Sequence, residues 1–278
     1  MGIAVLLKQV PDTTAKITVS GGRVDEAAVS KWSFSPYDEY ALESALQIKE
    51  AGGGDLIAVT CGPARAAKML TDAAAVGADA LVHILVDDLG ALDTTQVQAI
   101  LAAAVKHIGA DVVFCGKQAA DTNAGSTGPG VAHLLDASCV TMVSEVAADG
   151  DSFTAIRASA GGNERVAVSS PCVFAFDKGT TELRRPNVRG IMMAKKKIIE
   201  TIPTTSKRPN ALRLKPAAMI PARERTMKSN QRQIPPTSPH RQTMTAKIMS
   251  LRSSGSLLKE TIAAACSRPT PVRPPEPA

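Results

Sequence analysis

Aromatic residues are scarce in this chain. Its 278 residues include one Trp, two Tyr and five Phe, and none of these follows Phe176. The core must therefore be mostly aliphatic, which suits a buried parallel sheet covered by helices. No run of 18 apolar residues occurs either, so we expect no membrane span.

Residues that commonly catalyse reactions are also few or scattered. The four histidines are isolated from one another along the chain, and no GxSxG motif occurs. The five cysteines lack the spacing of a zinc site, so we expect reduced thiols, no metal and a cytoplasmic protein. Carboxylates are spread out without an evident acid–base pair. This pattern favours a protein that binds or carries a ligand over a hydrolase.

The positive charge is confined to one end of the chain. The formal net charge is +6, but residues 201–278 hold 14 Lys and Arg against three Glu, a net of +11, which leaves −5 for residues 1–200. The same end holds 12 of the 18 prolines and has no aromatic residue to stack on bases, so we expect no nucleic-acid partner. We therefore expect an α/β domain at 1–200 and a Pro/Ser/Arg-rich tail at 201–278, which is an extended arm or a disordered segment.

Strand-like and helix-like segments alternate over the first half of the chain. The predicted strands are Ile3–Leu7, Leu56–Thr60, Leu81–Val86 and Asp111–Cys115. The predicted helices are Tyr37–Glu50, Ala64–Val76 and Thr94–Ile108, the first of them capped by Ser35 and opened by Pro36. A short hairpin is expected at Lys16–Val24. This order predicts an α/β fold with an open, mostly parallel sheet and helices on both faces.

A run of short strands follows the alternating part. The predicted strands are Val140–Val146, Ser152–Ser159, Glu164–Val168 and Cys172–Phe176. We expect them to form a hairpin-like arrangement, in which Gly161-Gly162 supplies a turn. Beyond residue 201, one short helix is expected at Ser256–Ala265.

The loop at residues 116–128 is the most informative part of the sequence. It joins the Asp111–Cys115 strand to a helical pattern at Val131–Leu135, and it is rich in glycine and small polar residues. Such a junction leaves free backbone N–H groups at the positive end of a helix, which suits a phosphate. The spacing matches neither GxxxxGK[ST] nor GxGxxG. On the residues alone, a nucleotide site and an ordinary βα loop are equally good interpretations.

Three other loops follow predicted strands, at Lys8–Asp12, Ser33–Asp38 and Cys61–Pro63. In a doubly wound sheet, such loops converge on one crevice where ligands bind. We therefore expect them to meet the 116–128 loop. Lys8 is then either a point charge for a phosphate or a solvated lysine at a strand end.

Residues 183–200 combine basic clusters with a short apolar run, Ile191–Met193. Two interpretations are open. The segment is either a final amphipathic helix lying on the sheet or a partner-docking segment, with a small apolar anchor and a charged rim.

The order of several motifs resembles the beta subunit of electron transfer flavoproteins over about residues 1–202. These motifs are VLLKQVPD, FSPYDEYALESAL, AVTCGP, GKQAADTNAGSTGP, GGNERVAVSSPCVFAF and RRPNVRGIMMAKKKIIE. The resemblance implies a Rossmann-like domain of the adenine-nucleotide alpha-hydrolase-like type, in a heterodimer with an alpha subunit that holds most of an FAD. It further implies an electron carrier rather than a stand-alone enzyme. Electrons would come from acyl-CoA or similar dehydrogenases and pass to a quinone reductase or another acceptor.

The resemblance also implies a structural AMP and assigns residues to it. The implied nucleotide-binding residues are Leu6, Ser35, Pro36, Tyr37, Asp38, Cys61, Gly116, Lys117, Gln118, Ala119, Ala120, Asp121, Thr122, Asn123, Ala124, Gly125, Ser126 and Thr127. The implied partner-docking residues are Pro186, Asn187, Val188, Arg189, Gly190, Ile191 and Met192, with Val188 where the family usually has an anchoring leucine.

The chain departs from the family in places that leave alternatives open. Thr122, Asn123 and Ser126 replace the usual loop residues, and Ala160 replaces an acid. A bifurcating flavoprotein subunit with its own FAD in place of AMP is one alternative, and a flavin-independent nucleotide-binding protein is another. The tail after about residue 205 does not resemble the usual C-terminal arm, so it is either a divergent arm or the product of a reading-frame change.

Overall fold

The computed structural model describes residues 1–179 and 181–204, and its largest feature is a nine-stranded sheet. The strands of this sheet are β1 (Gly2–Leu7), β6 (Asp55–Gly62), β7 (Ala80–Leu85), β8 (Val112–Gly116), β9 (Ser138–Asp149), β10 (Ser152–Ser159), β11 (Gly162–Ser169), β12 (Cys172–Phe176) and β13 (Ile199–Pro203). Their spatial order is β11-β10-β9-β12-β8-β1-β6-β7-β13. In this spatial order, neighbouring strands are parallel from β9 to the edge strand β13. At the other edge, β9, β10 and β11 form an antiparallel meander.

Two small two-stranded sheets accompany the main one. β2 (Gln9–Pro11) pairs with β5 (Trp32–Phe34), and β3 (Val19–Ser20) pairs with β4 (Arg23–Val24). The second pair confirms the hairpin expected at Lys16–Val24, with a turn at Gly21 and Gly22, whose positive φ angles suit glycine.

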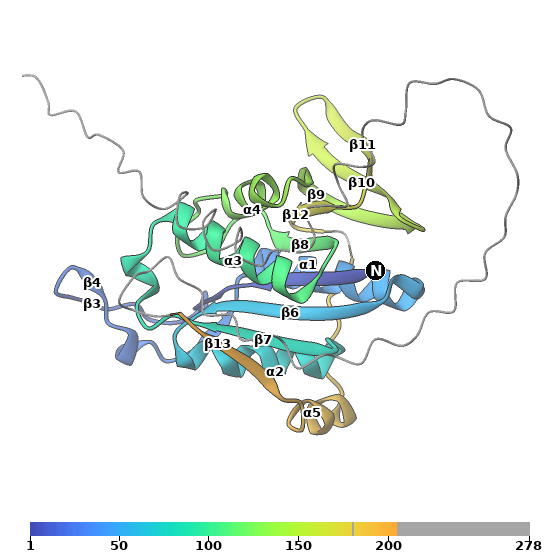
Figure 1. Ribbon diagram of the computed structural model, residues 1–278. Coiled ribbons are helices and arrows are strands. Elements are labelled where there is room, and N and C mark those ends of the chain that lie inside the picture. Colours follow the sequence, from blue (N-terminus) through green and yellow to red (C-terminus); the bar gives the residue numbers. More distant parts are fainter. Residues whose placement is uncertain (180, 205–278) are drawn as a thin grey trace, which may run out of the picture. The chain divides into compact units, whose positions relative to one another are not determined.

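Helices cover both faces of the sheet. They are α1 (Pro36–Ile48), α2 (Ala67–Val76), α3 (Thr94–Ile108), α4 (Thr127–Leu135) and α5 (Val188–Ala194), with single turns η1 (Glu26–Ala28), η2 (Lys49–Gly53), η3 (Ala64–Ala66) and η4 (Leu89–Ala91). Successive β1 residues point to opposite faces: Ile3 packs with α1 and α2, whereas Ala4 packs with α3 and α4. Figure 1 shows α3 and α4 together on one side of the strands. The predicted α/β fold is confirmed.

The direction of winding reverses beside β1. The chain runs from β1 through β6 to β7 on one side, and α3 then carries it back to β8 on the other side of β1. Both β6 and β8 are parallel to β1, so their carboxyl ends meet at one edge of the sheet. This edge is the topological switch point, where ligands bind in open α/β sheets.

The predicted place of Cys172–Phe176 in a hairpin was wrong. This segment is β12, which lies between β8 and β9 and is parallel to both. All five of its residues are buried, which is typical of a strand covered on both faces. The hairpin of β10 and β11 is confirmed, but its turn lies at Ala160 and Gly161, because Gly162 already pairs with Ser159 in the sheet.

Residues 183–200 do not form a single helix lying on the sheet. Only Val188–Ala194 is helical, and this α5 packs against α2. The chain then adds β13 beside β7, and the expected boundary at residue 200 falls inside that strand. β13 was not predicted, because it is an edge strand with one buried residue, Ile202, and so has no apolar period. The remaining tail from residue 205, including the helix expected at Ser256–Ala265, lies outside the described residues.

Within residues 1–179 and 181–204, no helix is long and apolar enough to cross a membrane.

The few aromatic residues are concentrated in one part of the core. The ring centroid of Phe174 lies 5.4 Å from that of Phe114 and 5.7 Å from that of Phe153, and Phe176 also stacks on Phe114, at 5.8 Å. All four rings are fully buried. They join the parallel strands β8 and β12 to the meander strand β10.

We expect Phe174→Ala to lower the free energy of unfolding by about 3–5 kcal/mol, because it leaves a cavity where two other rings meet. Urea unfolding followed by circular dichroism measures this loss. The control is Ile198→Ala, a truncation at a side chain that is 89% exposed, which should change little. Equal effects of the two substitutions would contradict the packing described above.

Candidate functional site

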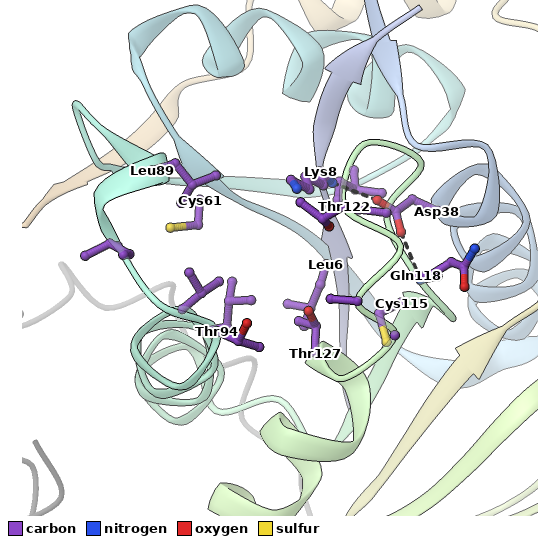
Figure 2. A pocket seen from close by; sticks show the side chains of 18 of the residues that line it. Leu6, Lys8, Asp38, Cys61, Leu89, Thr94, Cys115, Gln118, Thr122 and Thr127 are labelled. Carbon is purple, nitrogen blue, oxygen red and sulfur yellow. Dashed lines mark hydrogen bonds between the residues drawn. The ribbon is translucent and has the colours of Figure 1, made fainter. Parts of the chain in front are cut away.

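A cavity of about 200 Å³ lies at the switch point. Its floor is the carboxyl end of β1, and Figure 2 shows Leu6 there, between Cys61 of β6 on one side and Cys115 of β8 on the other. The 116–128 loop and the start of α4 form one wall. The lining residues are Leu6, Leu7, Lys8, Asp38, Cys61, Leu89, Leu92, Asp93, Thr94, Val97, Leu101, Cys115, Gly116, Gln118, Ala119, Thr122, Ala124, Gly125 and Thr127.

Two helices begin at this cavity, but their N-termini differ. At the start of α3, the Asp93 carboxylate accepts a hydrogen bond from the Gln96 N–H, and the Gln96 side-chain oxygen accepts one from the Asp93 N–H, so this end carries a capping box. At the start of α4, the Ser126 side chain makes no capping hydrogen bond. The first N–H groups of α4 therefore remain available to a ligand, and the helix dipole favours an anion there.

Asp38 joins the two strands that flank the switch point. One carboxylate oxygen accepts the Lys8 N–H at 2.7 Å, at the end of β1, and the other accepts the Gly116 N–H at 2.9 Å, at the end of β8. The residue is only 6% exposed. Burial raises the pKa of Asp38 to about 7, although the two backbone hydrogen bonds oppose this shift.

The glycines at both ends of the loop permit close packing. A Cβ on Gly116 would lie 2.5 Å from an Asp38 carboxylate oxygen, and a Cβ on Gly128 would lie 2.9 Å from Cys115 Sγ. Since real Cβ atoms do not approach neighbours so closely, a larger residue at either position would displace the carboxylate or α4. The glycine-rich composition is therefore explained by contacts with protein as well as by access for a ligand.

Several loop side chains hold the loop in place. The Gln118 amide donates to Asn123 Oδ1 at 3.0 Å, and the Lys117 ammonium lies 2.9 Å from an Asp177 carboxylate oxygen. Asn123 has a φ of 50°, a conformation that Asn tolerates better than most residues. The Gln98 amide of α3 donates to the Ser126 carbonyl at 2.9 Å. The loop is thus braced from within and from α3.

The structure brings most of the predicted site residues to the cavity, though in different roles. Ten of them line it: Leu6, Asp38, Cys61, Gly116, Gln118, Ala119, Thr122, Ala124, Gly125 and Thr127. The remaining eight do not: Ser35, Pro36, Tyr37, Lys117, Ala120, Asp121, Asn123 and Ser126. Of the three positions where the loop departs from the family, only Thr122 therefore faces the cavity.

The predicted capping role of Ser35 was wrong. Ser35 is the first residue before α1, but its side chain makes no capping hydrogen bond. Its hydroxyl instead donates to the Gln118 carbonyl at 3.3 Å, and so ties the start of α1 to the loop. Lys8 has a partner too, since its ammonium lies 2.7 Å from an Asp121 carboxylate oxygen.

One wall of the cavity was missed from the sequence. The segment that includes η4 and the start of α3 contributes Leu89, Leu92, Asp93, Thr94, Val97 and Leu101. A helix was predicted at Thr94–Ile108, but none of these six residues was assigned to the site. This wall could have been predicted from the topology. The segment follows the parallel strand β7, whose carboxyl end lies at the same edge of the sheet as those of β1 and β6.

A second cavity, of about 660 Å³, adjoins the first. The two share Lys8, Cys61, Leu89 and Thr122. Four of the charged side chains that line it form ion pairs with one another. Arg65 lies 2.9 Å from Glu26, and Arg23 lies 3.1 Å from Asp88. Arg65 also stacks on Trp32, with 3.8 Å between the guanidinium carbon and the ring centroid.

The two cysteines that line the cavity are not activated as nucleophiles. Burial raises the pKa of the Cys61 thiol to about 12 and shifts that of Cys115 upward as well, so neither is a nucleophile near neutral pH. His83 is buried in β7, with Nε2 3.0 Å from the Gly62 carbonyl oxygen. In the part of the chain that the structure describes, no three His, Cys, Asp or Glu residues are grouped to hold a metal ion.

The fold and cavity define the class: a Rossmann-like α/β domain with a binding cavity at its switch point. The family model described as electron transfer flavoprotein domain matches residues 24–207. The chain belongs to the electron transfer flavoprotein family.

Curated relatives agree with this assignment. The chain is 36% identical over 203 residues to the electron transfer flavoprotein subunit beta of Bacillus subtilis, covering 73% of this chain and 79% of the relative. It is 35% identical over 204 residues to the human subunit beta, covering 72% and 80%. It is also 33% identical over 197 residues to the acryloyl-CoA reductase electron transfer subunit gamma of Anaerotignum propionicum, covering 69% and 73%.

The buried position of Asp38 gives a pH dependence with a definite sign. The folded state retains a proton to about pH 7 that the unfolded chain releases near pH 3.8, so the stabilisation from this group is present at low pH and lost as the pH rises through 7. We expect the unfolding free energy of the wild type, relative to Asp38→Asn, to fall between about pH 5 and pH 8. Urea unfolding of both proteins across this range measures the difference, and a constant difference would contradict the assignment.

Proposed function

We propose that this chain is the nucleotide-holding subunit of a heterodimeric electron transfer flavoprotein, with a structural AMP in the cavity at the switch point. The observation that carries the proposal is the contrast between the capped α3 and the uncapped α4 at one cavity. The AMP phosphate would lie at the start of α4, beside Thr127 and the glycines of the loop. The adenosine would lie against the apolar wall that includes Leu6 and Leu89.

The partner would be a flavin-bearing alpha subunit, as the family membership suggests. Bound FAD supplies the redox chemistry, and this chain contributes the surface on which the partner and flavin are held. The proposed electron donors are acyl-CoA or similar dehydrogenases, and the acceptor is a quinone reductase or another redox protein. The absence of an activated nucleophile at the cavity supports a nucleotide that is held and not transformed.

The proposed docking segment presents apolar side chains to solvent. Val188 is 76% exposed, Met192 is 62% exposed and Met193 is 55% exposed, all on α5. Methionines adapt to irregular partner surfaces, and the flanking arginines and lysines supply a charged rim. We propose that a dehydrogenase covers this face during electron transfer.

One observation favours the alternative of a second FAD. The cavity of about 660 Å³ adjoins the first, so a ligand longer than AMP could continue into it past Lys8 and Thr122. Nucleotide analysis separates the two ligands. After denaturation of the purified heterodimer, one AMP and one FAD per dimer support the main proposal, whereas two FAD and no AMP support the alternative.

A charge introduced into the loop tests the nucleotide position. Ala124 lines the first cavity, so we expect Ala124→Glu to expel most of the AMP by repulsion of its phosphate. Ala120→Glu is the matched control, because Ala120 belongs to the same loop but lines neither cavity. AMP retained in both variants would contradict the proposed site.

A substitution on α5 tests the proposed docking role of this helix. We expect Val188→Ala to raise the KM for a dehydrogenase by up to about ten-fold, because about two buried methyl groups are lost from the interface. Bound AMP should be unchanged. Ile198→Ala removes a comparably exposed side chain outside the docking set and should leave the KM unchanged. An unaltered KM in Val188→Ala would count against the docking assignment.

A further inference from the structure

An arginine fixes the chain just before the proposed docking helix. The Arg184 guanidinium donates from Nε to a Glu43 carboxylate oxygen at 2.8 Å and from one terminal nitrogen to the other oxygen at 2.9 Å. Its terminal nitrogens also donate to the two oxygens of Glu50, at 2.6 Å and 3.1 Å. One side chain therefore binds two carboxylates at once.

The location of these carboxylates makes the contact unusual. The Glu43 side chain on α1 is only 6% exposed, and the Arg184 N–H also donates to it at 3.3 Å. A buried carboxylate is costly without a partner, and a planar guanidinium can serve two carboxylates where an ammonium is a single point charge. Contact with Glu43 and Glu50 shifts the pKa of Arg184 upward, so the clamp stays charged.

The same stretch of chain is held again on the far side of α5. Asn187 caps α5 by accepting the Gly190 N–H at 2.7 Å, and Gly190 packs so closely on the Ala75 carbonyl of α2 that a Cβ would not fit. Beyond the helix, the Lys197 ammonium donates to the carbonyls of Ala78 and Asp79. The segment is therefore attached to α1 and η2 before the helix, and to the turn between α2 and β7 after it.

The exposed anchor lies between these attachments. Val188 is four residues from Arg184 and makes little contact with its own chain, since it is 76% exposed. Its position is therefore determined by the backbone that carries it. Holding that backbone in the binding conformation before the partner arrives reduces the entropy lost on association.

We propose that Arg184, through its clamp on Glu43 and Glu50, is the positioning residue that orders the docking helix α5 for its redox partner. The proposal rests on the docking role of α5 given above. Arg184 itself need not touch the partner. Its effect is on the fraction of molecules in which α5 is ready to bind.

The test uses the heterodimer with its flavin-bearing subunit and a purified acyl-CoA dehydrogenase, charged with its acyl-CoA, as the electron donor. If Arg184→Gln leaves α5 ordered in a tenth of molecules, the KM for the dehydrogenase rises about ten-fold while the maximal rate is kept. Hydrogen–deuterium exchange should accelerate across residues 186–196. Reduction of the flavin by dithionite, which needs no docking, should not change.

Three further variants make the test specific. Arg184→Lys keeps the charge but not the two-carboxylate geometry, so its KM should lie between those of Arg184→Gln and the wild type. Arg185→Gln removes the same charge one position along, at an exposed residue, and should leave exchange at 186–196 unchanged. If Arg184→Gln fails to fold, Glu50→Gln removes the exposed half of the clamp and should shift the KM and exchange in the same direction.

The outcomes separate this proposal from the docking assignment. A raised KM in Val188→Ala with unchanged KM and exchange in Arg184→Gln would overturn the clamp and keep the docking face. Unchanged KM in both variants would overturn the docking assignment, and the clamp proposal with it. Slowed dithionite reduction in Arg184→Gln would overturn it too, because the substitution would then disturb the flavin site rather than the docking helix.

Discussion

The binding edge of this domain depends on one buried carboxylate. Parallel strands diverge at a switch point, which leaves main-chain N–H groups there without a strand partner. Asp38 accepts two of these, from the ends of β1 and β8, and thereby fixes the start of α1 between them. The cavity has a defined shape because these three elements cannot move independently. The requirement also explains Gly116, since the carboxylate occupies the space of a Cβ.

The sequence was most reliable where a pattern was strong and local. The helix predicted at Thr94–Ile108 has those bounds in the structure, as α3. The glycine-rich loop at 116–128 indicated the right edge of the sheet. The loops after β1, β6 and β8 lie together because these strands are parallel and their carboxyl ends share one edge of the sheet.

The failures had a common cause, which is that partners distant in sequence decide the outcome. A five-residue apolar strand such as Cys172–Phe176 has no feature that distinguishes insertion between β8 and β9 from pairing in a hairpin. β13 buries too few residues to produce a period. Ser35 satisfied the rule for a cap, but the carbonyl of Gln118, 83 positions away, took its hydroxyl. Asn123 and Ser126 do not line the cavity, and the Asn123 side chain accepts a hydrogen bond from Gln118 within the loop.

The unequal ends of α3 and α4 have a consequence for orientation. A cavity between two positive helix ends would accept an anion at either, and a ligand could enter in two directions. Here Asp93 neutralises one end with its own carboxylate, while the other end is left open. The two ends of the cavity therefore differ electrostatically, and only the end at α4 keeps the positive end of a helix dipole without a capping side chain.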